Sequence, residues 1–211
     1  NPYSNEREMF VMNLNALTPG TAGYEAVLAH EFQHMIHWHQ DSNEAAWVNE
    51  GASELAEDLN GYGWSEGNLR SLERDADLQL TAWPHESGNI GAHYGASYLM
   101  LRYWLDRFGP DALRDLVQHP AEGPAGFASV LAARDLGLTF EEVFADWLVA
   151  NALDLPTGSY ARFGYADLDV GVDPHQRVYT YPWTLEDQVH QYGADYIDVT
   201  VPDGEALRVT F

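Results

Sequence analysis

Two histidines and a glutamate stand at the spacing of a metal site within VLAHEFQHMIHWHQ, residues 27–40. On an α-helix, residues four positions apart lie on the same face, so His30 and His34 can present two imidazole nitrogens to one ion. Glu31 lies one position further round the helix, where its carboxylate can reach a water on that ion without binding the ion. This HExxH arrangement supplies two neutral nitrogen ligands and a carboxylate base, which suits zinc and hydrolytic chemistry.

A third ligand is expected on a second helix, because a catalytic zinc ion usually takes three protein ligands and leaves a fourth position open. The segment WVNEGASELAE, residues 47–57, predicts such a helix, with Glu50 and Glu54 on one face. Its NEG tripeptide lies beside the turn that folds this helix back on the first, so we predict Glu50 as the third ligand. Glu54, one turn further on, is expected to accept the far N–H of a ligand histidine.

His37 is the alternative third ligand, since it continues the helical face that carries His30 and His34. Three ligands on successive turns of one straight helix would lie along a line rather than around an ion. A glycine at position 37 followed by a histidine at position 40 would break the helix and solve this problem, but the chain has His37 and Gln40 there. We therefore interpret His37 and His39 as residues that do not bind the metal.

Acyl hydrolysis also needs a hydrogen-bond donor for the oxyanion of the tetrahedral intermediate. His93 and Tyr94 stand at the opening of a strong helical pattern, directly after the glycine-containing segment SGNIG. Both are candidates for this donor. The alternative for Tyr94 is packing in the core, and the alternative for His93 is a place on the surface.

The elements that would position these residues are mostly helical. Apolar periodicity and capping residues predict helices at 21–40, 44–59, 66–80, 92–108, 111–118, 125–136 and 139–153. Strands are predicted at 8–17 and in the alternating segments DYIDVTV and ALRVTF, and residues 81–91 read as a loop. The expected fold class is α+β: a mainly helical catalytic domain over 1–185 with an N-terminal strand, then the start of a β-sandwich-like module over 186–211.

The composition excludes several classes of partner. The formal net charge is −23 and every basic residue is arginine, so we expect neither nucleic acid nor a membrane as a partner. The longest apolar stretch, YLMLRYWL, is interrupted by Arg102 and is too short to span a bilayer. The absence of cysteine excludes disulfides, thiolate ligands and a cysteine nucleophile. The chain starts at Asn1 without a signal-peptide pattern and ends inside a strand pattern, so we expect a piece of a longer protein with its N-terminal part truncated.

HEFQHMIHW followed by WVNEGASELAE resembles the gluzincin zinc metallopeptidases, most closely their hyicolysin-like branch of secreted bacterial proteins. The resemblance is specific in these two segments, and a weaker likeness runs through HYGASYLMLRYWLDRFG to QYGADYIDV. It implies a zincin-type fold, secretion, His30, His34 and Glu50 as zinc ligands, and Glu31 as catalytic base. The chain lacks the Gly-Ala-Met-Glu-Asn motif of gluzincin aminopeptidases and the glycine that continues the zinc motif of the immune-inhibitor-A type.

We therefore expect a zinc-dependent endopeptidase that cleaves protein or peptide substrates with a water on the zinc ion, activated by Glu31. The sequence leaves its oligomeric state open, and a monomer is favoured. The alternatives are a non-catalytic binding module that retains the fold and a zinc aminopeptidase. Intact Glu31 disfavours the binding module, because loss of the base is the simplest route to inactivity. No Gly-x-Ser-x-Gly elbow supports a serine hydrolase, no carboxylate pair marks a glycosidase, and no twelve-residue Asp/Asn loop supports a bound Ca2+ ion.

Overall fold

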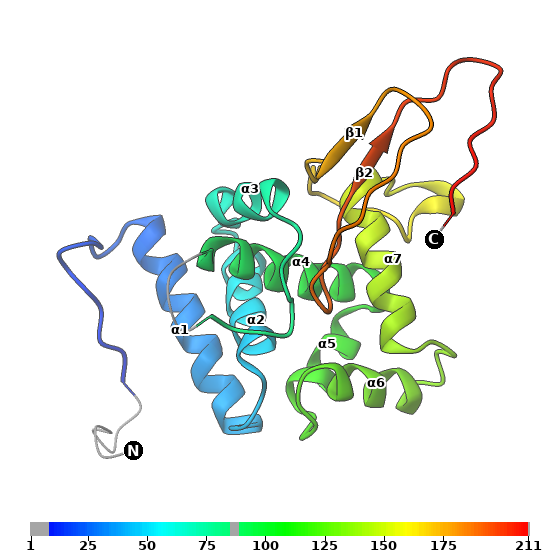
Figure 1. Cartoon of the computed structure of the whole chain (residues 1–211). Helices are drawn as coiled ribbons and strands as arrows, with labels where there is room; N and C mark the ends of the chain where they lie inside the picture. Colours follow the sequence, from blue (N-terminus) through cyan, green and yellow to red (C-terminus); the bar gives the residue numbers. More distant parts are fainter. Residues whose placement is uncertain (1–8, 85–88, 211) are drawn as a thin grey trace.

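The computed structural model describes residues 9–84 and 89–210. Within these ranges the chain forms helices and one pair of short strands (Figure 1). The helices are α1 (Ala22–Gln40), α2 (Ala46–Leu59), α3 (Glu66–Arg74), α4 (Ile90–Phe108), α5 (Pro110–Val117), α6 (Pro124–Ala133), α7 (Phe140–Leu153) and the 3-10 turn η1 (Gly158–Tyr160). The strands are β1 (Gln176–Val178) and β2 (Ile197–Val199). The fold is α+β and mainly helical, which confirms the predicted class.

α1 and α2 form a helical hairpin at one edge of the molecule (Figure 1). α1 begins after Thr21, whose hydroxyl accepts a hydrogen bond from the Tyr24 N–H at 3.3 Å, as expected of an N-cap. α2 buries a broad face that runs from Trp47 to Leu55, whereas most side chains of α1 stay at least partly exposed. α1 therefore packs from the outside against α2, and α2 connects it to the core.

α4 is the central helix, because every residue from 95 to 104 is buried. Two glycines let its neighbours come close. A Cβ at Gly51 of α2 would lie 2.5 Å from the carbonyl oxygen of Ser97, and a Cβ at Gly95 would lie 2.5 Å from the carbonyl oxygen of Asn68. Any larger residue at either position would push the helices apart. These contacts hold the first half of α4 against both α2 and α3.

An aromatic cluster joins the second half of the helical unit to this central helix. Phe127 of α6 stacks on Trp47 of α2 at 5.5 Å and meets Trp104 of α4 edge-on at 4.8 Å. α7 begins with a complete capping box, in which Thr139 and Glu142 each accept a hydrogen bond from the other's backbone N–H. One continuous core therefore runs from α2 to α7.

β1 and β2 pair in parallel, with Gln176 opposite Ile197 and Val178 opposite Val199. Parallel neighbours normally require a long crossover that contains a helix, yet residues 179–196 of this structure contain neither helix nor strand. The Leu80 N–H donates to the Tyr192 carbonyl at 3.1 Å, which attaches the connection to the helical unit. The pair joins segments on both sides of the domain boundary that the sequence predicts near residue 186.

Some predicted elements differ from the structure. Residues 9–17 form no strand: Val11 and Leu14 are exposed, and no strand of the described chain lies beside them. A strand without a partner leaves its backbone groups unpaired and is not stable. α3 ends at Arg74 rather than near 80, and residues 206–210 at the chain end are not a strand either.

The remaining helices confirm the predicted segments to within a few residues, and α4 begins two residues before its predicted start. The predicted loop at 81–91 contains residues 85–88, which lie outside the described residues. Of the helices that the structure describes, none combines enough length with enough apolar character to cross a membrane.

Candidate metal centre

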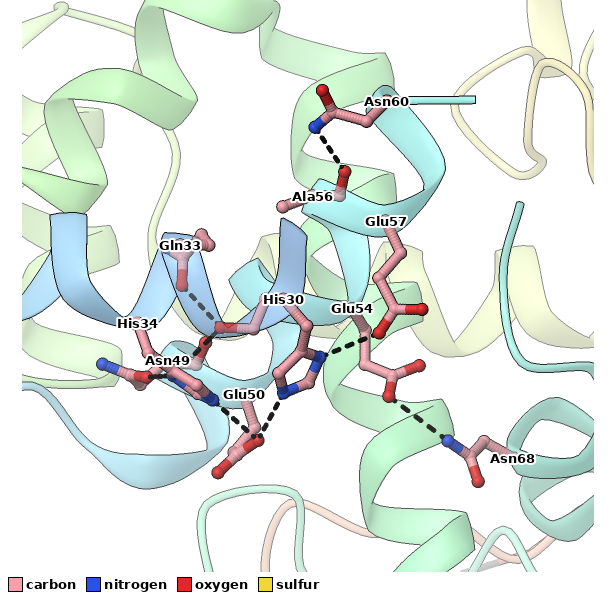
Figure 2. A network of polar contacts seen from close by, with 11 residues as sticks. His30, Gln33, His34, Asn49, Glu50, Glu54, Ala56, Glu57, Asn60 and Asn68 are labelled. Carbon is pink, nitrogen blue, oxygen red and sulfur yellow. Dashed lines mark hydrogen bonds and ion pairs between the residues drawn. The ribbon is translucent and has the colours of Figure 1, made fainter. Parts of the chain in front are cut away.

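The structure brings His30, His34 and Glu50 together between α1 and α2 (Figure 2). The two histidines lie one turn apart on α1, and Glu50 reaches them from the first turns of α2. One carboxylate oxygen of Glu50, Oε2, lies 3.4 Å from His30 Nε2 and 3.5 Å from His34 Nε2. In a tetrahedral zinc site with ligand bonds of about 2.0–2.1 Å, ligand atoms lie about 3.3 Å apart. Both distances from Glu50 Oε2 therefore fit a zinc site, and one ligand atom from each of the three residues lies within 4.8 Å of the others.

Hydrogen bonds at the far side of each ring orient the two imidazoles. His30 Nδ1 lies 2.9 Å from the Glu57 carboxylate, and a carboxylate can only accept there, so Nδ1 carries the proton. His34 Nδ1 contacts the side-chain oxygen of Asn49 and lies 3.0 Å from Ser53 Oγ. In the neutral tautomer, both Nε2 atoms are then left with a free lone pair that points to Glu50. A metal-binding histidine needs this arrangement.

Glu50 supplies the negative charge of the three donors. Its Oε2 atom is buried and makes no hydrogen bond of regular geometry. Burial alone would raise the pKa of Glu50, but the two imidazoles beside it lower that pKa to about 2. The carboxylate is therefore ionised at every pH at which the protein would work, and a cation between the three donors would satisfy its buried oxygen.

The expected role of Glu54 is corrected by the structure. Glu57, not Glu54, accepts the hydrogen bond from His30, and Glu54 accepts one from Asn68 at 3.5 Å (Figure 2). The two carboxylates lie three positions apart on the same face of α2, and His30 lies beside the later one. Burial and the charge of Glu57 raise the pKa of Glu54 to about 7.

Replacing Glu57 by glutamine should therefore weaken zinc binding by about 10- to 100-fold, the usual effect of losing the partner of a ligand histidine. The amide is nearly isosteric, but it cannot hold the His30 ring with a charged acceptor. Competition titrations against a chelator would measure the loss. Glu54→Gln is the matched control and should cost less; an equal or larger loss in Glu54→Gln would restore Glu54 to the predicted role.

Zinc binding to this site should also release a proton at neutral pH. Burial alone would lower the pKa of His30 from its ordinary value of 6.5, but hydrogen bonds to Glu50 and Glu57 raise it to about 10 in the metal-free protein. Below that value a zinc ion must displace the proton. Zinc affinity should rise about tenfold per pH unit from about pH 7 to about pH 9, measured by chelator competition. An unperturbed histidine would give a flat profile over this range.

The same raised pKa has a consequence for the stability of the metal-free protein. Because the folded state binds the His30 proton more tightly than the unfolded chain, this group stabilises the fold fully below about pH 6.5. Its contribution is lost as the pH rises toward 10.

Tyr94 lies next to this centre. Its pKa is raised by burial, by the charge of Glu50 and a hydrogen-bonding interaction with that carboxylate, and by the charges of Glu54 and Glu31. Its ring packs edge-on against Trp83 at 4.9 Å. Glu31 is exposed on α1, next in sequence to the ligand His30. Tyr94 is therefore close enough to Glu50, Glu54 and Glu31 for their charges to raise its pKa.

His93 points to a different environment. Its ring lies 6.2 Å from the ring of Trp83, and its pKa is lowered by burial, against a hydrogen bond with the Ala82 backbone that raises it. None of these contacts involves the three donors. Of the two predicted oxyanion donors, the position of Tyr94 is the more suitable.

His37 lies outside the group of donor atoms. Its side chain is fully buried, its Nδ1 is 3.3 Å from Gln33 Nε2, and burial lowers its pKa to about 4, so it stays neutral. His39 is exposed. These positions agree with the interpretation of both residues as non-ligands.

The sequence prediction did not include the residues that hold His34. Ser53 is fully buried and donates to Gln33 Oε1 at 2.6 Å, while its oxygen faces His34 together with Asn49. A usable signal was present: Asn49 precedes the predicted ligand Glu50, and Ser53 stands one turn after Asn49 on the same face.

No known protein family matches the chain, and no curated protein shows significant similarity to it.

Proposed function

We propose that this protein is a zinc-dependent peptidase, and more specifically an endopeptidase. The observation that carries the proposal is the convergence of His30, His34 and Glu50, in which Glu50 Oε2 lies 3.4 and 3.5 Å from the two Nε2 atoms, with Glu31 on the helix that carries both histidines. The resemblance of the two motif segments to gluzincin metallopeptidases supports it. A bound zinc ion would supply Lewis acidity, which polarises a carbonyl group and acidifies water.

Glu31 provides the base in this mechanism. It is exposed, so it can meet a substrate from solvent, and it lies on the helix that carries both histidines. Its carboxylate takes the proton of the attacking water and passes it to the amine that leaves when the peptide bond breaks. One residue therefore acts first as base and then as acid.

Tyr94 provides the hydrogen-bond donor for the oxyanion. Its raised pKa keeps the phenol protonated throughout the neutral range, so the O–H is available to donate. Tyr94→Phe should lower kcat by about 100-fold with little change in KM, because the donor acts mainly in the transition state. Phenylalanine keeps the contact with Trp83, so zinc content and melting temperature should remain nearly unchanged. Full activity in the variant would assign Tyr94 to packing.

Turnover of an unfolded protein such as casein, with zinc content measured on the same sample, tests the proposed function. We expect zinc-loaded protein to cleave internal peptide bonds and the chelated protein to cleave none until zinc is restored. Stoichiometric zinc without any cleavage would indicate the binding module instead. Release of single N-terminal residues without internal cuts would indicate an aminopeptidase.

A further inference from the structure

A second group of metal-ligating side chains lies far along the chain from this centre, at the base of the strand pair. His175 stands directly before β1, Asp195 shortly before β2, and Asp187 in the connection between them. The distance from His175 Nε2 to Asp187 Oδ2 is 3.2 Å, and that from His175 Nδ1 to Asp195 Oδ1 is 3.5 Å. One ligand atom from each residue lies within 4.8 Å of the others. The two short distances run to different nitrogens of the His175 ring, so a single ion would bind one of these nitrogens together with the two carboxylates.

Asp77 and His190 surround this group with further charge. Asp77 follows α3 and accepts two hydrogen bonds from His190, one from the backbone N–H at 2.8 Å and one at Nδ1 at 3.0 Å. Burial and the charges of Asp77 and Asp187 raise the pKa of Asp195, against the opposite effect of the two histidines. Across residues 9–84 and 89–210, no arginine forms an ion pair with any of these three aspartates. The negative charges of these carboxylates are therefore balanced only by the neighbouring imidazoles.

The strand pair at this place is short. β1 and β2 pair over three residues each, and a two-stranded unit of this size is marginal in water. The connection between them has no regular structure, and the chain has no cysteine with which to close it by a disulfide. A ligand that bound both ends of the connection would stabilise the folded state, because the unfolded chain does not assemble the site.

We infer that His175, Asp187 and Asp195 bind a second divalent metal ion of the zinc class, which fastens the β1–β2 connection. One imidazole nitrogen and two carboxylate oxygens form a ligand set that zinc accepts, whereas calcium takes six to eight oxygen ligands and has no use for the imidazole. His175 and Asp187 are exposed, so water can complete the coordination. The role is structural and independent of the proposed peptidase activity.

The experiment uses the whole chain with its first site disabled by His30→Ala and Glu50→Ala, because His30 also belongs to a neighbouring group with Glu54 and Glu57 that could hold a metal ion. After dialysis against micromolar zinc, this variant should retain about one equivalent of zinc per chain, and its melting temperature should rise on adding zinc alone. Adding Asp187→Asn and Asp195→Asn should abolish both effects. The matched control adds Asp203→Asn and Glu205→Gln, which remove two charges from exposed residues after β2 and should leave both effects intact.

Two results would overturn the inference: no zinc retained by the variant with the first site disabled, or equal retention when Asp187 and Asp195 are neutralised. Cobalt(II) titration of the same proteins gives a second measurement. Its visible bands should weaken on replacing exposed His175 by alanine, a change that spares the core. Because the first site is disabled throughout, failure of the peptidase proposal would not affect the outcome.

Discussion

Replacing Glu50 by alanine should lower zinc affinity at the first site more than about 100-fold. Even the hydrogen-bond partner of a ligand histidine is worth about 10- to 100-fold, and Glu50 is the charged donor itself. Its Oε2 atom lies within 3.5 Å of both imidazole Nε2 atoms, and without it two neutral rings remain. Chelator competition and metal analysis after dialysis would measure the loss. The proposed second site would bind a separate equivalent of zinc. The measurement should therefore be made in a protein that also carries Asp187→Asn and Asp195→Asn.

His37→Ala is the control for this prediction, because His37 was the alternative ligand. Its buried ring packs beside Gln33, away from the three donors, so alanine should leave a cavity and lower the melting temperature. Zinc affinity, measured well below that temperature, should stay within a few fold of the unmodified protein. If His37→Ala lost its zinc and Glu50→Ala kept it, the ligand assignment would be reversed.

The grouping of the three donors was predictable from the sequence because their arrangement depends on short-range geometry. His30 and His34 meet on one helix face at any i, i+4 spacing, whatever the rest of the fold does. Glu50 required one further inference, that the break after Gln40 folds a second helix back against the first. Five residues separate α1 from α2 in the structure, and so short a connection favours two helices that pack side by side.

The hydrogen-bond partners of the histidines were less predictable because they depend on how two helices cross. Glu54 and Glu57 lie on the same face of α2, and nothing in the local sequence says which of them meets His30. The close approach of α2 to α4 at Gly51, together with the packing of Trp47 and Val48, sets the position of α2. Those contacts come from residues far apart in the sequence.

Long-range packing also explains the elements that differ from prediction. Leu78 and Leu80 continue the apolar pattern after α3, but they are buried in the core outside any helix, where Leu80 bonds to Tyr192. Segment 9–17 has strand-like composition, but its ring contact is between Phe10 and Phe32 of α1 rather than with a strand. A strand forms only where a partner exists, and composition alone does not supply one.

Replacing Glu31 by glutamine should abolish peptide cleavage while leaving zinc binding and folding intact. The amide has the size of the carboxylate but cannot accept the proton of the attacking water, and general base catalysis is worth about 10²- to 10⁴-fold. Glu31 is exposed and is not one of the three donors, so its replacement should change neither the metal site nor the core. The measurement is kcat on an unfolded protein substrate, with zinc content and melting temperature recorded on the same preparation.

Glu25→Gln is the matched control for Glu31→Gln, since it removes the same charge from an exposed position of the same helix. Glu25 lies in the first turn of α1, where its carboxylate accepts a hydrogen bond from the Tyr62 hydroxyl at 3.4 Å, and it is not one of the three donors. It should keep full activity, so a loss confined to Glu31→Gln would come from the base and not from the reduced negative charge near the site. Retention of more than a few per cent of turnover in Glu31→Gln would remove Glu31 from this role. The Glu31 carboxylate would then have no assigned part in the reaction.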